Sequence, residues 1–252
     1  MNIVVCVKRV PDDGVTVKLG ADGKPAVSEI TQVVDSFDTY ALEMATRFKE
    51  ANGGEVSVIT TDDLAAATPL LRSCLSVGAD KAYCVNLTDV CARGTTVAGI
   101  EHIGGADIIL VGSESTDTAS MEFGARISNK MGVAFVPNVK EFVPAEGGLT
   151  VKQETEDGYR VIDVPTPCVL SVVKPGYDPR YPSIKAKLAA KKMPIGEITA
   201  ADLGITPHAQ GHYSVVKYAA PAKRQAGVKL QEEDQTVAVG KVLGMLKERK
   251  LV

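Results

Sequence analysis

The run Ile3-Val4-Val5-Cys6-Val7 opens the chain with five consecutive apolar residues, most of them β-branched. A strand with one wet face would show polar residues at every second position, and this run shows none. Unbroken hydrophobicity over so few residues is typical of a parallel strand buried on both faces. Four later runs share this character: Val56–Thr60, Ala82–Val85, Ile108–Val111 and Cys168–Val172.

Helical patterns lie between these runs. Phe37–Lys49 carries apolar residues at the 3.6-residue period and ends before Gly53-Gly54, and Leu64–Leu75 and Ser120–Met131 read similarly. Alternation of buried strands with amphipathic helices indicates βαβ units. We therefore predict an α/β fold with a doubly wound, mostly parallel, Rossmann-like sheet.

Two β-hairpins are expected as insertions in this pattern, because glycine-containing turns separate pairs of β-rich segments. The expected strand pairs are Val15–Leu19 with Lys24–Ser28, and Thr150–Glu154 with Arg160–Val164.

The periodicity fades after Ile195, so we expect an α/β domain over 1–195 and an extended arm over 196–252. Helical spacing returns at Asp234–Lys250. On physical grounds alone, this last helix either packs on its own domain or wraps a partner.

Composition excludes several functional classes. A net charge of −3, 5% aromatic residues and no Trp leave little to attract or stack nucleic acid. No apolar run approaches the roughly 18 residues of a spanning helix, so we expect no stable membrane insertion. Met1 leads directly into the first strand, from which we expect a cytoplasmic protein.

Metal and thiol chemistry find little support. The five cysteines are dispersed and mostly lie in apolar runs, as small buried residues do. His208 and His212 have i,i+4 spacing, but Pro207 and Gly211 oppose the helix that would align them as ligands. We therefore expect no metal site.

Ligands of open parallel sheets bind beyond the carboxyl ends of the strands, here after Val7, Thr60 and Val111. The third loop, Gly112–Ser120, is the richest in small and hydroxyl residues. It is consistent either with phosphate binding at a helix N-terminus or with simple capping by Thr118 or Ser120. No catalytic side-chain constellation stands out, so a bound cofactor would carry any redox chemistry.

Pro179-Arg180-Tyr181-Pro182-Ser183-Ile184, with the basic run Lys185–Lys192 after it, is a second candidate. Two prolines exclude a helix interior or central strand. Loops that carry a Tyr, an Ile and several cations usually contact a ligand or a partner protein.

Eight segments, in order and in spacing, resemble the β subunit of electron transfer flavoproteins. They are Val5–Asp12, Asp35–Glu43, Leu71–Asp80, Leu110–Gly124, Pro179–Ile184, Ala190–Pro194, Ala201–Gly204 and Lys223–Lys229.

This resemblance implies an electron carrier without catalytic side chains of its own. It implies an α subunit that shares an FAD with this chain, and AMP or a second FAD in the β-subunit site. In a bifurcating member, NADH would be the donor. It also implies an acyl-CoA dehydrogenase or similar flavoenzyme as redox partner, and an arm that reaches around the α subunit.

Candidate residues follow from the matched positions. Those for nucleotide contact are Cys6, Asp35, Phe37, Asp62, Asp117, Thr118, Ser120 and Gly124. Those for partner docking are Tyr181, Ile184 and Leu188, with Ile184 as the apolar anchor.

The chain departs from the family pattern at the nucleotide loop, where Ser113–Ser120 replaces a segment that begins with Lys-Gln. Asp35 stands for the usual Asn, and Asp62-Asp63 brings an extra pair of acids. Carboxylates near a phosphate reduce affinity unless they meet a cation or ribose hydroxyls. The identity of the nucleotide therefore stays open.

Two other functions remain in view. One is a stand-alone nucleotide-binding regulatory module of similar α/β fold, which would need no α subunit. The other is an ATP-using enzyme, which the lack of a glycine-rich phosphate loop with a basic residue disfavours.

Overall fold

The structure, a computed structural model, describes residues 1–87, 94–205, 215–224 and 226–252. The chain forms two compact units, Met1–Val216 and Lys217–Val252. Cys91, His208 and His212 lie outside the described residues. No helix in the described ranges combines the length and the apolar composition needed to cross a membrane.

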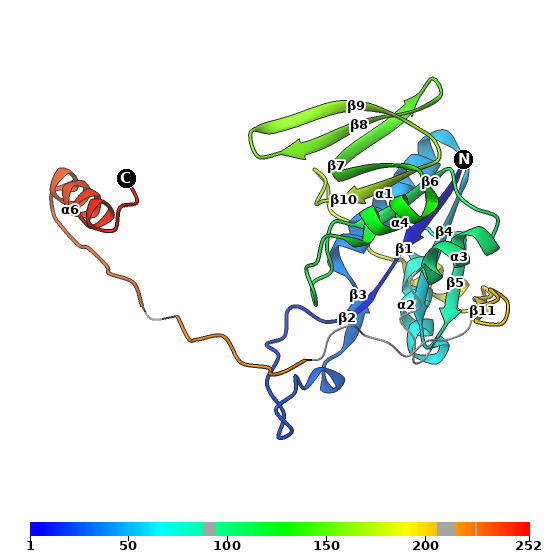
Figure 1. Cartoon of the computed structure of the whole chain (residues 1–252), viewed down its shortest axis with the longest axis horizontal. Helices are drawn as coiled ribbons and strands as arrows, with labels where there is room; N and C mark the ends of the chain where they lie inside the picture. The colour runs from blue at the N-terminus through cyan, green and yellow to red at the C-terminus, as the bar shows by residue number, and fades with distance from the viewer. Residues whose placement is uncertain (88–93, 206–214, 225) are drawn as a thin grey trace. The chain divides into compact units, whose positions relative to one another are not determined.

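A large sheet forms the centre of the first unit (Figure 1). Among the described residues it has nine strands, in the order β11-β5-β4-β1-β6-β10-β7-β8-β9. In that order their bounds are Gly196–Thr199, Lys81–Asn86, Glu55–Asp62, Asn2–Cys6, Ile108–Gly112, Cys168–Val172, Ala134–Ala145, Gly148–Thr155 and Gly158–Pro165. The pairs from β11 to β7 are parallel, while β7-β8 and β8-β9 are antiparallel. The predicted doubly wound, mostly parallel sheet is confirmed.

The strand order reverses beside β1. The chain builds β4 and β5 on one side of β1 and then returns to place β6 on its other side, where Val4 is opposite Ile109. This reversal is the topological switch point at which ligands of such sheets bind.

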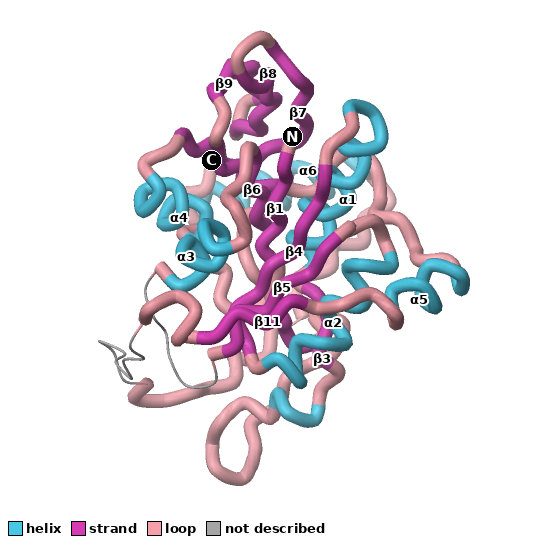
Figure 2. Tube along the Cα trace, turned by 90° about the vertical axis from the view of Figure 1, so that its right-hand side faces the viewer, coloured by secondary structure: helices cyan, strands magenta, loops and turns pink. Residues whose placement is uncertain are grey.

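Helices cover both faces of the sheet (Figure 2). α1 (Ser36–Asn52) and α2 (Leu64–Ser76) pack into one apolar core cluster with one face of the strands. α3 (Thr95–His102) and α4 (Phe123–Met131) contribute Val97, Ile100 and Ile127 to a second cluster on the other face. The unbroken apolar strands are explained by these two cores, since each strand packs on both sides.

The first predicted hairpin is wrong in its residues. Val15–Leu19 and Lys24–Ser28 form no strands in the described structure; an isolated Leu19–Pro25 bridge and a 3-10 turn at Val27–Glu29 lie there instead. The antiparallel pair is formed further out by β2 (Arg9–Pro11) and β3 (Gln32–Val34). The β2–β3 pair buries Val10, whereas Val15 and Val17 are exposed and have no core to cover.

The second predicted hairpin is confirmed as β8 and β9, and β7 extends it to a three-stranded antiparallel sheet edge. The first unit continues past residue 195, because β11 pairs with β5 in parallel. Four residues are too short to show a period, so the sequence carried no sign of this edge strand.

Among the described residues of the second unit, Lys217–Val252, one helix forms, α6 (Gln235–Glu248). The Asp234 side chain caps this helix by accepting from the Thr236 N–H at 2.7 Å. The predicted terminal helix is confirmed. The domain boundary at 195/196 and the use of the arm stay predictions.

Candidate functional site

The exits of β1 and β6 meet at the switch point, and a buried carboxylate joins them. Asp38, in the first turn of α1, accepts the Lys8 N–H on Oδ2 at 2.7 Å and the Gly112 N–H on Oδ1 at 3.0 Å. Burial, with a smaller contribution from Asp35, raises the pKa of Asp38 to about 8. One side chain therefore holds the backbone at the carboxyl ends of both strands.

Gly112 is required by this arrangement. A Cβ at this position would lie 2.7 Å from Asp38 Oδ1 and 2.7 Å from Phe37 Cβ. Any larger residue would push α1 away from the end of β6.

Asp35 ties the loop after β6 to the same helix. It caps α1 by accepting the Phe37 N–H on Oδ1 at 3.0 Å, and its Oδ2 accepts the Thr116 N–H at 2.7 Å. Asp35 is fully buried, and both of its oxygens receive backbone donors. Both oxygens of Asp35 therefore bind backbone N–H groups inside the protein and are not presented to a ligand.

Lys8 closes the other side of this loop. Its Nζ lies 2.7 Å from Asp117 Oδ1 and 3.2 Å from Ser115 Oγ, and the Ser115 and Thr118 hydroxyls are 2.8 Å apart. Burial acts to raise the pKa of Asp117, but hydrogen bonds from Lys8 and Ser115 lower it on balance. In the family that the chain resembles, the position of Ser113 carries a cation. Here Lys8 instead supplies a cation on the rim of the loop.

Asp62, at the end of β4, is paired in the same way. Arg9 donates to it through Nε at 2.6 Å and through Nη2 at 2.9 Å. Burial acts to raise the pKa of Asp62, and the Arg9 hydrogen bond outweighs it, so the pKa is lowered. Asp63 instead caps α2 by accepting the Ala66 N–H at 2.9 Å.

The helix after the loop begins later than the sequence predicts. Ala119 and Met121 have φ angles of 47° and 55°, which are incompatible with an α-helix, so α4 begins at Phe123 rather than near Ser120. The proposed capping by Thr118 or Ser120 is therefore wrong. In the described structure the cap residue Glu122 forms no side-chain cap hydrogen bond and instead pairs with Arg126 Nη2 at 2.9 Å, one turn along the helix.

The remaining predicted contacts lie around this edge. Cys6 ends β1 and is buried, which together with Asp38 raises the pKa of its thiol. Phe37 is half-buried in the first turn of α1, and Ser120 is exposed on the loop. Gly124 is buried, and a Cβ there would lie 2.8 Å from Phe135 and 3.0 Å from Val111, so its evident role is close packing of α4 on the sheet.

The structure therefore brings Asp35, at the start of α1, against the loop that carries Asp117 and Thr118, and adds three residues that sequence reasoning missed. These are Lys8, Ser115 and Asp38. The position of Lys8 directly after the first strand was the available signal. Asp38 gave none, since a first-turn acid is common on any helix.

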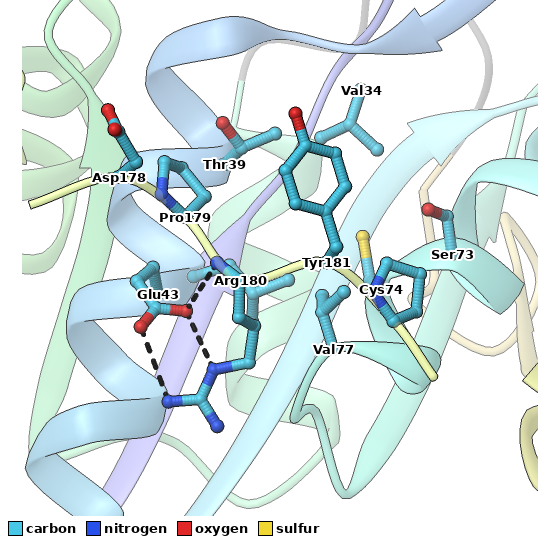
Figure 3. A pocket seen from close by; sticks show the side chains of 12 residues that line it. Val34, Thr39, Glu43, Ser73, Cys74, Val77, Asp178, Pro179, Arg180 and Tyr181 are labelled. Atoms are coloured by element: carbon cyan, nitrogen blue, oxygen red, sulfur yellow. Dashed lines mark hydrogen bonds and ion pairs between the residues drawn. The ribbon is translucent and has the colours of Figure 1, made fainter. Parts of the chain in front are cut away.

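The second candidate region is anchored on α1. Arg180 donates through Nε to Glu43 Oε2 at 2.8 Å (Figure 3). It also donates through Nη1 to Glu50 Oε1 at 2.5 Å. A pocket of about 410 Å³ lies beside it, lined by residues of α1, α2 and 178–182. Tyr181 is 96% exposed at the rim of this pocket.

α5 (Ile184–Ala190) follows, capped by Ser183, whose Oγ accepts the Ala186 N–H at 3.1 Å. Ile184 is 81% exposed and Leu188 is 56% exposed. Their i,i+4 spacing places both on one face of the helix. Three large side chains, Tyr181, Ile184 and Leu188, are thus exposed within eight residues of sequence.

Comparison with known proteins gives a consistent result. A family model described as the electron transfer flavoprotein domain matches residues 26–203. A protein named electron transfer flavoprotein subunit beta from Thermoanaerobacterium thermosaccharolyticum is 35% identical, with 84% of this chain and 83% of that protein covered. The caffeyl-CoA reductase-Etf complex subunit CarD of Acetobacterium woodii is 29% identical over the full length of both chains. A subunit beta of Syntrophomonas wolfei is also 29% identical, over 94% of this chain and 93% of that protein.

Proposed function

The chain belongs to the electron transfer flavoprotein family, and from this premise we propose that its β1–β6 edge binds a nucleotide while α5 docks a partner flavoenzyme. The protein is a β subunit that acts in electron transfer. As such it pairs with an α subunit and carries electrons between flavin-dependent dehydrogenases, such as acyl-CoA dehydrogenase, and a second redox partner.

The pairing of the acids at the switch point is the observation that supports a nucleotide there. Asp117 meets Lys8 and Asp62 meets Arg9, while both oxygens of Asp35 accept backbone N–H groups. The acids that depart from the family pattern, Asp35, Asp62 and Asp63, are thus each engaged by Arg9 or by backbone N–H groups, which weakens the electrostatic objection to a phosphate.

The residues present fit a phosphate-bearing group. Lys8, which it would share with Asp117, lies on the rim, and the hydroxyls of Ser115, Thr118 and Ser120 on the same loop would donate to its oxygens. AMP and a second FAD share this chemistry, so both are retained as candidates. An FAD shared with the α subunit supplies the electron-carrying flavin, and in a bifurcating form the second FAD would accept hydride from NADH.

Co-expression tests the pairing. We expect the chain to form a yellow complex when produced with its α subunit, and the complex to exchange electrons with a reduced flavoprotein dehydrogenase. The alternative, a regulatory module without an α subunit, predicts a chain that is soluble, folded and colourless alone and that ignores the α subunit. The cytoplasmic location stays a prediction, which cell fractionation would test.

The docking assignment has its own test. Ile184→Ala should leave flavin content and thermal stability unchanged, since the side chain is exposed, and should slow transfer to acyl-CoA dehydrogenase by roughly tenfold or more, as loss of an apolar anchor does. Stopped-flow kinetics would measure the transfer. A variant with the transfer rate of the wild type would refute the assignment.

A further inference from the structure

The docking segment, defined as residues 179–190, makes two arginine-mediated attachments that the proposed function does not explain. One arginine belongs to the segment and reaches α1, and the other belongs to α2 and reaches the end of α5. Between them lie the exposed residues Tyr181, Ile184 and Leu188.

The first attachment is a five-bond contact. Arg180 donates to Glu43 through its backbone N at 3.2 Å, through Nε at 2.8 Å and through Nη2 at 3.3 Å, and to Glu50 through Nη1 at 2.5 Å and Nη2 at 2.9 Å. Glu43 and Glu50 are seven residues apart, which is two helical turns, so both carboxylates face the same guanidinium. A planar fork that meets two carboxylates fixes orientation as well as position.

Glu43 makes this contact more than a surface ion pair. It is 3% exposed and also accepts from Arg47 Nε at 2.6 Å. The Arg47 guanidinium in turn lies 3.9 Å from the centre of the Tyr177 ring, just before the docking segment. Tyr177 contacts Arg47 and Arg180 contacts both glutamates, so the chain is held on both sides of Asp178.

The second attachment terminates the short helix. Arg72 of α2 donates through Nη1 to the carbonyl oxygens of Ala190, the last residue of α5, and of Met193 beyond it. A cation at this end also complements the helix dipole. With Ser183 at its start, α5 is capped at both ends although it has only seven residues.

We propose that Arg180 and Arg72 are positioning residues that hold the docking segment in its binding shape before the partner flavoenzyme arrives. Helices of this length are unstable alone, so an unattached segment would have to order itself during association. Preforming it lowers that entropic cost without adding a contact to the partner. The proposal rests on the docking function assigned above.

Amide hydrogen exchange of the complete αβ complex tests the positioning directly and needs no partner. We expect Arg180→Gln to raise exchange at least tenfold in peptides covering 178–190 and to leave the remaining α1 and sheet peptides unchanged. Arg72→Gln should raise exchange mainly in 186–193. Lys185→Gln is the matched control, since it removes one exposed charge from the same segment.

Electron transfer then tests the purpose. With acyl-CoA dehydrogenase reduced by butyryl-CoA as donor, Arg180→Gln should raise KM for the dehydrogenase about tenfold at unchanged kcat, because the docked segment adopts the same shape. Arg180→Lys should recover part of this change. Glu50→Gln, which removes the exposed carboxylate of the contact, should produce a smaller rise and serves if Arg180→Gln does not fold.

The outcomes separate the two proposals. Exchange in 178–190 no higher than in Lys185→Gln overturns the positioning role, as does raised exchange with unchanged KM. If Ile184→Ala still slows transfer in either case, the docking function stands without the positioning. If no complex, the wild type included, transfers electrons to the dehydrogenase, the docking function fails while the exchange result still decides the positioning.

Discussion

Two regions depend on the same helix in different ways. The first turn of α1 holds the nucleotide loop through Asp35 and Asp38, which accept backbone N–H groups of Thr116, Lys8 and Gly112. The later turns hold the docking segment through Glu43 and Glu50, which bind the side chain of Arg180. A backbone amide is present whatever residue stands there, whereas a guanidinium is not.

This difference accounts for how the two regions relate to the family pattern. Ser113–Ser120 departs from that pattern, yet the loop is still tied to α1 because its anchors are mostly amides. Pro179–Ile184 follows the pattern closely, and its main attachment would be lost with Arg180. The four predictions below test this division, from the largest expected effect to the smallest.

Asp38→Ala should be the most damaging change. It leaves the buried N–H groups of Lys8 and Gly112 without their acceptor and opens both loops, for a loss of about 2–4 kcal/mol in the free energy of unfolding. Urea denaturation of the αβ complex would measure it. Stability equal to wild type would show that the loops are held by other contacts.

The raised pKa of Asp38, about 8, predicts a pH effect. A carboxyl that binds its proton more tightly when folded stabilises fully below its unfolded pKa, and this contribution is lost as pH rises through 8. Relative to Asp38→Asn, the wild type should therefore lose about 2–3 kcal/mol between pH 6 and 8. A pH-independent difference between the two proteins would place the pKa elsewhere.

Glu43→Gln and Glu50→Gln form a matched pair at the docking segment. Glu43 is buried between Arg47 and Arg180, so its loss should cost about 1–3 kcal/mol. Glu50 is more exposed, and its loss should cost less than about 1 kcal/mol. Thermal denaturation of both variants gives the ranking, and equal effects would contradict the central place of Glu43.

Thr116→Ala should have the smallest effect, below about 0.5 kcal/mol, because alanine keeps the N–H that Asp35 accepts. Nucleotide content should also stay at the wild-type value. A large loss of stability or of nucleotide from this substitution would mean that the loop is held by its side chains. The contrast between the two regions would then be wrong.

The sequence predicted the parallel sheet and its major helices because long apolar runs and amphipathic stripes are local signals. It predicted neither β11 nor the β2–β3 pair, whose three or four residues carry no period and pair only through the tertiary structure. The start of α4 was missed because residues 119 and 121 have left-handed backbone conformations without being glycine. At the site, residue types indicated the loop, but the anchors Asp38 and Lys8 required contacts across 74 and 109 positions of sequence.

The central claim is that the β1–β6 edge binds a nucleotide in addition to the FAD shared with the α subunit. Denaturing the purified αβ complex and identifying the released nucleotides by chromatography and mass spectrometry tests it most directly. A nucleotide at this edge would give two nucleotides per heterodimer, either one FAD with AMP or two FADs. One FAD with no second nucleotide would contradict it.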